Sequence, residues 1–177
     1  MSPTVPLQLK TPRLLLRGFR NDDWQAMHEH YSDEECVRFT FGRAQNEGGS
    51  WRAVASMVGH WQLRGYGPYA LEDKASGAVL GTVGLWYPVD WPEPEIKWAL
   101  LRRHWGQGYA SEAVRAVQAM TREHFDKPLI SFINSANAPS IALALAVGAT
   151  LERETEFRGS PWHVYRHPRL RQEMPRA

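Results

Sequence analysis

Residues 105–110 read Trp-Gly-Gln-Gly-Tyr-Ala, and this stretch decides the predicted fold and the predicted site. It lies between an apolar segment, Ile96 to Leu101, that is typical of a strand and a helical pattern that begins near Ala110. Glycine lets the backbone approach a ligand closely, and a helix N-terminus offers unpaired amides and a positive dipole. The stretch therefore predicts an anion site, with a pyrophosphate as the expected group. On these six residues alone, a purely structural turn is an equal alternative.

Two other phosphate-binding motifs are not supported. The nucleotide-hydrolase loop needs Gly, four residues and then Gly-Lys-Ser or Gly-Lys-Thr, and the chain contains no such string. The dinucleotide fingerprint needs a third Gly or Ala where this chain has Ser111, and an acidic residue that closes the next strand. Asp126 has about the right spacing but precedes that strand.

Length and composition predict one compact domain over residues 1–177, with tails at 1–8 and 170–177. A chain of 177 residues with 43% hydrophobic content can bury roughly two-thirds of its unfolded surface without metals or disulfides. The single cysteine, Cys36, has no internal disulfide partner, which favours a reducing cytoplasm. No apolar run approaches the roughly 18 residues needed to cross a bilayer, so no membrane partner is expected.

Charge and histidine spacing narrow the candidate partners further. The net charge is +2, and the basic residues never form a run of more than two, so a nucleic-acid partner is not favoured. The seven histidines include no His-Glu-x-x-His string and no ligand spacing. We therefore expect no metal.

The N-terminal half shows an apolar run followed by two helical patterns. The run is Leu14 to Leu16, and Arg20-Asn21-Asp22-Asp23 after it supplies a helix cap. A weak segment, Val37 to Phe41, precedes a second helix, which is expected to be capped by Gly48-Gly49-Ser50 and to end at Gly65.

The middle of the chain is rich in strand patterns. Pro68 to Glu72 and Val79 to Tyr87 read as a hairpin, because residues 73–77 between them tolerate tight turns. Glu95 to Leu101 is the strand that leads into the glycine turn. The hairpin argues against a doubly wound parallel sheet.

The C-terminal third begins with an amphipathic helix after the glycine turn. Four of its polar residues are expected to face water: Glu112, Arg115, Gln118 and Arg122. Leu129 to Ile133 reads as a short strand, a small helix ends at Gly148, and Leu151 to Phe157 pairs with Trp162 to Arg166 as a final hairpin. These patterns predict an α/β (α+β) fold with one mixed sheet flanked by helices.

With this order of elements, the chain resembles the GNAT superfamily of acyl-CoA N-acyltransferases. The cofactor motif of that family is Gln or Arg, two residues, Gly, one residue, and Gly or Ala. It matches at Gly108 and Ala110, while Trp105 replaces the usual first residue. Because the cradle works through backbone amides, this departure weakens the match only mildly.

Three further strings resemble the branch of ribosomal-protein N-terminal acetyltransferases in particular. They are residues 106–113, Asn137-Ala138-Pro139-Ser140 and Thr11-Pro12-Arg13-Leu14. The likeness covers residues 9–167. It implies a mostly antiparallel central sheet of six to seven strands, flanked by about four helices.

The resemblance implies acetyl-CoA as the cofactor and assigns residues to it. The backbone of Trp98, Ala99 and Leu100 would pair with the pantetheine amides, although these residues also suit an ordinary core strand. Asn137 would orient the pantetheine or the hydroxyl of Ser140. The pyrophosphate would be held by the amides of Trp105, Gly106, Gln107, Gly108, Tyr109 and Ala110.

Two residues are predicted to move protons. Resemblance places Glu95 near the entry of the acceptor amine, where burial would raise its pKa toward neutrality and make it the base. The alternative is a solvated loop-end charge, like Asp90 and Glu93. Ser140 is the predicted acid for the departing thiolate, although helix capping explains Asn137 and Ser140 equally well. A thiolate whose conjugate pKa is roughly 8.5 can also leave without an acid.

The predicted function is transfer of an acetyl group from acetyl-CoA directly to a primary amine, on a protein or peptide N-terminus or a small molecule. Trp86, Tyr87 and Trp91 are predicted to wall the acceptor cleft, with Asp90, Glu93 and Glu95 drawing in a cationic amine. Two alternatives stay open: a non-catalytic acyl-CoA-binding or sensing module, and a ribosome- or nucleic-acid-associated protein. A homodimer also stays open.

Overall fold

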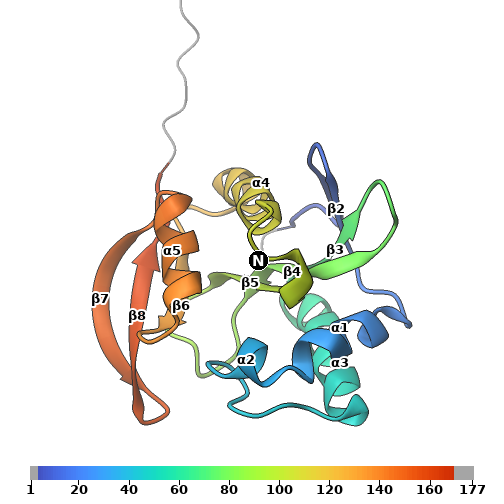
Figure 1. The fold of residues 1–177 in the computed structure, drawn as a ribbon. Helices are drawn as coiled ribbons and strands as arrows, with labels where there is room; N and C mark the ends of the chain where they lie inside the picture. The colour runs from blue at the N-terminus through green and yellow to red at the C-terminus, as the bar shows by residue number, and fades with distance from the viewer. Residues whose placement is uncertain (1–3, 170–177) are drawn as a thin grey trace, which may run out of the picture.

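A computed structural model describes residues 4–169, in which one eight-stranded sheet carries helices on both faces (Figure 1). The strands are β1 (Leu9–Lys10), β2 (Leu14–Arg17), β3 (Pro68–Asp73), β4 (Val79–Trp86), β5 (Glu95–Leu100), β6 (Ile130–Asn134), β7 (Thr150–Phe157) and β8 (Ser160–Arg166). The helices are α1 (Asp23–Tyr31), α2 (Glu34–Val37), α3 (Glu47–Arg64), α4 (Tyr109–His124) and α5 (Ala138–Ala146), with a 3-10 turn, η1 (Arg102–His104).

The sheet runs in the order β1-β2-β3-β4-β5-β6-β8-β7. Every neighbouring pair is antiparallel except β5 and β6, which are parallel. The predicted fold class is therefore confirmed. The sheet has one strand more than the predicted maximum, because the two-residue β1 pairs with β2. Within the described residues α2 is the additional helix, and it begins just before the segment that showed only a weak pattern.

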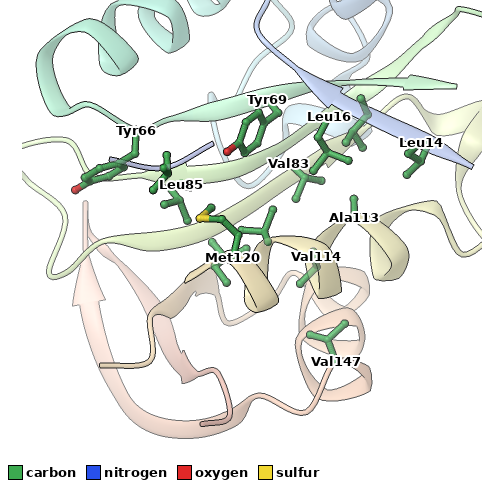
Figure 2. Packing of buried hydrophobic residues seen from close by; sticks show 14 of the residues in the cluster. Leu14, Leu16, Tyr66, Tyr69, Val83, Leu85, Ala113, Val114, Met120 and Val147 are labelled. Atoms are coloured by element: carbon green, nitrogen blue, oxygen red, sulfur yellow. The ribbon is translucent and has the colours of Figure 1, made fainter. Parts of the chain in front are cut away.

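The larger core lies between the sheet and α4. Ala113, Val114 and Met120 of α4 face side chains from β2, β3 and β4, among them Leu16 and Val83 (Figure 2). The apolar stripe predicted for this helix is therefore buried as expected. Burial of a side chain the size of valine, leucine or methionine contributes about 1.5–3 kcal/mol, so this interface fixes α4 firmly to the strands.

A second core covers the opposite face. Helices α1 and α3 lie on that face (Figure 1). Met27 of α1 and Val54 and Met57 of α3 are buried there with Leu101, which follows β5. The C-terminal end of β5 is thus held between two packed layers. The fixed end of β5 also fixes the position of the glycine turn, because that turn begins only a few residues later.

Helix α3 begins earlier than its sequence pattern predicts. Its N-cap is Asn46, whose side chain accepts a hydrogen bond from the amide of Gly49 at 2.8 Å. The prediction that Gly48-Gly49-Ser50 caps this helix is therefore wrong, since those residues form its first turn. The predicted end is confirmed, because Gly65 adopts a left-handed conformation and its amide bonds to Trp61.

The described part of the N-terminal segment packs against the sheet. Val5 is buried in the main core, and the carbonyl of Pro6 accepts a hydrogen bond from the Tyr69 hydroxyl at 2.6 Å. Residues 4–8 of the predicted tail therefore contribute to the fold. The predicted tail at 170–177 lies outside the described residues. None of the helices formed by residues 4–169 has the length and apolar character needed to cross a membrane.

Candidate active site

Strands β5 and β6 touch at one point and then diverge. Glu95 and Ile130 are their only paired residues. Beyond that point, side chains take over the bonding: the Ser131 hydroxyl donates to the carbonyl of Ile96 at 2.6 Å, and the Phe132 amide donates to Glu95 Oε2 at 2.9 Å. Buried backbone groups are thus satisfied without a continuous ladder, so a gap can open in the middle of the sheet.

A buried polar chain holds this divergence in place. The Ser131 hydroxyl donates its hydrogen bond to the Ile96 carbonyl, so at 2.8 Å it must accept one from His167 Nε2. The other ring nitrogen of His167, Nδ1, accepts a hydrogen bond from the Gln118 side-chain amide at 2.8 Å. Burial, with a smaller contribution from Arg166, lowers the pKa of His167 to about 4, so the ring stays neutral. The prediction that Gln118 faces water is wrong, because this residue is 4% exposed and anchors α4 to the splayed strands.

A cavity of about 530 Å³ lies between the open edge of β5, α2, the glycine turn and α5. It brings together nearly all residues predicted for the cofactor, although they come from segments about 40 positions apart. Gln107 is exposed and does not belong to the lining. The predicted residues that line the cavity are Trp98, Ala99, Leu100, Trp105, Gly106, Gly108, Tyr109, Ala110, Asn137 and Ser140.

The glycine turn presents free amides at the head of α4. Gly106 and Gly108 adopt φ angles of +72° and +79°, in the left-handed region that glycine enters without steric cost. Within residues 4–169, no hydrogen bond uses the backbone amides from Gly106 to Ser111. Unpaired amides at the positive end of a 16-residue helix form a site for an anionic group.

The Thr11-Pro12-Arg13-Leu14 string near the N-terminus holds this turn in place. Glu112 accepts hydrogen bonds from the Thr11 hydroxyl at 2.7 Å and from Arg13 Nε at 2.7 Å. Arg13 Nη1 also donates to the carbonyl of Gln107 at 3.0 Å, and its guanidinium lies 4.2 Å from the centre of the Tyr109 ring. Glu112 is therefore paired rather than free in water. The Thr-Pro-Arg-Leu string fixes the start of α4 from about 100 residues away.

The backbone of β5 alternates between its two neighbours. The Leu101 amide donates to Leu80 of the preceding strand at 3.0 Å, so odd-numbered residues of β5 bond to β4 and even-numbered ones face the gap. Trp98 and Leu100 therefore turn amide and carbonyl groups toward the cavity. The backbone of Ala99 faces β4, so this orientation does not favour the predicted backbone role of Ala99.

Trp105 takes a structural position where the family motif has Gln or Arg. Its indole N–H donates to the carbonyl of Leu100 at 2.9 Å, and His30 Nδ1 donates to the same oxygen at 3.1 Å. Burial lowers the pKa of His30 to about 4, so this contact is made by a neutral ring. The two donors fix the end of β5, while the amide of Leu100 stays turned toward the gap.

Helix α2 and the segment after it close one side of the cavity. Cys36, Arg38, Phe39 and Thr40 all contribute to its lining, and the sequence did not mark them as site residues. Their segment shows no clear periodicity, and only the packing of α1 and α3 brings it opposite β5. Burial raises the pKa of the Cys36 thiol, which keeps it protonated near neutral pH.

A second cavity, of about 300 Å³, lies on the other side of Trp98 and contains Glu95. Glu95 is 5% exposed, and its oxygens accept hydrogen bonds from Trp91 Nε1 at 2.7 Å and from the Phe132 amide at 2.9 Å. Burial raises the pKa of Glu95 to about 7, although both hydrogen bonds oppose the shift. The alternative of a solvated loop-end charge is therefore excluded for Glu95.

The two other acids near this cavity are already neutralised. Asp90 pairs with Arg158 at 2.7 Å, and Glu93 pairs with Arg166 at 2.9 Å and Lys127 at 3.2 Å. The expectation that three acids give the acceptor cleft a negative charge is therefore wrong. Of the predicted aromatic walls, Trp86 and Trp91 line the cavity. Tyr87 does not; it packs against the main core with Arg64 4.6 Å from its ring centre.

The two cavities meet at the start of α5. The Asn137 side chain accepts a hydrogen bond from the Ser140 amide at 3.3 Å, so Asn137 acts as a helix cap. The Ser140 hydroxyl accepts a hydrogen bond from Trp98 Nε1 at 3.3 Å, and it donates a hydrogen bond to none of the described residues. Both cavities share part of their lining, namely Phe39, Thr40, Trp98, Asn137 and Ser140.

The sequence comparisons agree with this architecture. The profile of the acetyltransferase (GNAT) domain family matches residues 13–150, so the chain belongs to this family of acetyltransferases. An uncharacterized N-acetyltransferase, p20, of Bacillus licheniformis is 29% identical over 109 residues. That match covers 60% of this chain and 61% of p20, less than two thirds of its length.

Solved structures share the fold over nearly the whole chain. An acetyltransferase from Agrobacterium tumefaciens str. C58 has a TM-score of 0.82 and 26% identity, with 93% of this chain and 95% of that chain covered. RimL, a ribosomal L7/L12 alpha-N-protein acetyltransferase in complex with coenzyme A, has a TM-score of 0.72 and 18% identity, with coverages of 92% and 96%. The predicted GNAT superfamily is confirmed.

Proposed function

We propose that this protein is an N-acetyltransferase that moves an acetyl group from acetyl-CoA directly to a primary amine. One observation carries the proposal. Free amides at the head of α4 open into a cavity that meets, at Trp98 and Ser140, a second cavity with a buried carboxylate. Such a pair of chambers suits a reaction between an anionic carrier and an amine.

The residues present fit the carrier. The amides from Gly106 to Ser111 would hold its pyrophosphate, and the outward-facing backbone of Trp98 and Leu100 would pair with the amides of its pantetheine arm. When bound, acetyl-CoA supplies an acetyl group activated as a thioester. The complex of RimL with coenzyme A supports this assignment, because both proteins share the fold.

Proton movement falls to Glu95 and Ser140. An amine must lose a proton to become nucleophilic, and a carboxylate with a pKa of about 7 can accept that proton near neutral pH. The Ser140 hydroxyl can donate its proton to the departing sulfur, because no described residue takes that proton. Cys36 would remain a thiol, which favours direct transfer over a covalent enzyme intermediate.

The proposal is tested by calorimetry with acetyl-CoA followed by a thiol-release assay. The acceptor panel contains polyamines, aminoglycosides, amino acids and peptide N-termini. Binding together with thiol release on at least one amine supports the enzyme. Binding without release on any amine supports the acyl-CoA-sensing alternative instead, and no binding removes both.

The nucleic-acid alternative is tested separately, by RNA affinity over a range of salt concentrations. An affinity that falls steeply as salt rises would favour it. The cytoplasmic location and the homodimer stay predictions of the sequence.

A further inference from the structure

Lys97 is a charged residue of the second cavity that the proposed reaction does not use. It lies on β5 two residues after Glu95, so both side chains project from the same face of the strand. Its ammonium nitrogen lies 4.5 Å from the centre of the Trp86 ring, inside the cavity lining. The side chain is half-buried.

Lys97 has no carboxylate partner among the residues that the structure describes. None of the ion pairs within residues 4–169 includes it. The neighbouring Glu95 is bonded to Trp91 and Phe132, and Asp90 is bonded to Arg158. The acids at the cavity are thus engaged elsewhere.

The histidine beside Trp86 adds no charge next to Lys97. His60 stacks on Trp86 at a centroid distance of 4.9 Å. Its Nδ1 donates to the carbonyl of Tyr66 at 2.7 Å, and its Nε2 accepts from the Tyr87 amide at 2.8 Å, so the ring is neutral. Burial lowers the pKa of His60 and thereby favours this neutral form.

The solvation that the Lys97 ammonium group loses on burial is only partly replaced by contacts within the protein. A contact with an aromatic face returns only part of the solvation that burial removes from an ammonium group. Burial accordingly lowers the pKa of Lys97, while the nearby charge of Glu95 opposes the shift. A ligand that brings an anionic group to the ammonium would supply the missing partner, and a purely cationic amine would be repelled.

The size and walls of the cavity narrow the ligand further. About 300 Å³ is at the lower end of the range for small-molecule sites, so a small acceptor fits better than a folded protein terminus. Aromatic rings form much of the wall and favour an apolar or aromatic side group. They belong to Phe39, Phe41, Trp86, Trp91, Trp98, Phe132 and Trp162.

We infer that the acceptor is a small amine that carries its own carboxylate, with that carboxylate paired to Lys97 and an apolar side group packed on the aromatic wall. A free aromatic or large aliphatic amino acid has this chemistry. Its amino group would face Glu95 while its carboxylate faces Lys97. The inference rests on the proposed acetyl transfer and replaces the cationic acceptor expected from the sequence.

Matched pairs of amines test the inference, since the members of each pair differ only in the carboxylate. The pairs are L-phenylalanine with phenethylamine, L-tryptophan with tryptamine, and L-leucine with 3-methylbutylamine. With the parent protein, we expect the carboxylate member of the best pair to have a kcat/KM at least about tenfold higher. Equal or faster turnover of the amines without a carboxylate would overturn the inference.

Variants of Lys97 then assign the preference to one side chain. Lys97→Met keeps the aliphatic stem and is expected to reduce the preference to below about threefold, whereas Lys97→Arg should retain most of it. Removing the cation also changes the pKa of Glu95, but that change affects both members of a pair and cancels in their ratio. Arg158→Gln is the matched control, because Arg158 lines the same cavity but already has Asp90 as partner. A preference that survives Lys97→Met, or that disappears with Arg158→Gln, would contradict the role of Lys97.

The two proposals fail in different ways. Thiol release with polyamines, aminoglycosides or peptides, but with none of the three free amino acids, would overturn the inference and leave acetyl transfer intact. Absence of thiol release with every amine would remove the enzyme itself. A second readout is calorimetry of the coenzyme A-loaded protein with N-acetyl-L-phenylalanine and with N-phenethylacetamide. The first should bind more tightly, and only while Lys97 is present.

Discussion

The two cavities of this protein differ in what builds them. The cavity proposed for the cofactor presents backbone: free amides at the head of α4 and the outward-facing peptide groups of Trp98 and Leu100. The cavity proposed for the acceptor presents side chains, with Glu95 and Lys97 among aromatic rings from several separate strands and loops. A backbone site depends on local conformation, while a side-chain site depends on what the fold brings together. The cavity built from backbone should therefore tolerate most substitutions other than those of its glycines. The cavity built from side chains should be sensitive to the replacement of single residues.

Removing the carboxylate of Glu95 should produce the largest effect. We expect Glu95→Gln to lower kcat by at least about 100-fold near pH 8, because an amide cannot accept the proton of the amine. In the parent, kcat/KM should rise with pH through about 7, as Glu95 loses its proton, and the variant should lack this limb. Asp90→Asn is the control, since Asp90 is an exposed, ion-paired acid at the same cavity and should change kcat less than about twofold. An unchanged pH profile in Glu95→Gln would exclude Glu95 as the base.

A side chain in the glycine turn should weaken the cofactor cavity alone. Gly106→Val should raise the Kd for acetyl-CoA by about tenfold or more, because a left-handed φ strains a residue with a Cβ by roughly 1–2 kcal/mol and the added side chain crowds the free amides. Gly159→Val is a close match, since Gly159 also has a left-handed φ of +77° and nothing within 4 Å of an added Cβ, but lies in the β7–β8 turn. Calorimetry that shows equal losses of affinity in both variants would mean that the turn acts only through stability.

The hydroxyl where the two cavities meet should have a smaller effect. We expect Ser140→Ala to lower kcat by about three- to tenfold, because a thiolate with a conjugate pKa of roughly 8.5 leaves slowly but measurably without an acid. Ser135→Ala is the control, because Ser135 lies just before the same helix and lines neither cavity. Full activity in Ser140→Ala, measured by thiol release at saturating acetyl-CoA, would remove Ser140 from the mechanism.

The smallest expected effect is a shift of the pH profile. The Trp91 indole donates to Glu95 and thereby lowers the pKa of that carboxyl, so Trp91→Phe should move the rising limb of kcat/KM to higher pH. The loss should be about two- to fivefold at pH 6.5 and vanish near pH 9. Trp162→Phe removes a similar ring from the same wall, but its indole donates to Ser160, so its profile should keep the parent midpoint. A common shift in both variants would point to a general change in the wall.

Local patterns were sufficient for most of the fold. The apolar stripe of α4, the hairpins and the left-handed end of α3 at Gly65 follow from periodicity and from the properties of glycine, which act within a few residues. Long-range polar contacts were not predictable in this way. Gln118 has the spacing of a water-facing residue, yet a hydrogen bond to His167, 49 positions away, buries it.

The sequence by itself predicted where the anion site at the head of α4 lies, because glycines that enter the left-handed region just before a helix leave its first amides unpaired, and this effect acts within a few residues. Only the tertiary structure decided the character of the acceptor cavity. It buried Glu95 at the divergence of β5 and β6, paired Asp90 and Glu93 with distant cations, and left Lys97 without a carboxylate partner among the described residues. Charge and pKa depend on neighbours in space, and residues far apart in the chain supply those neighbours.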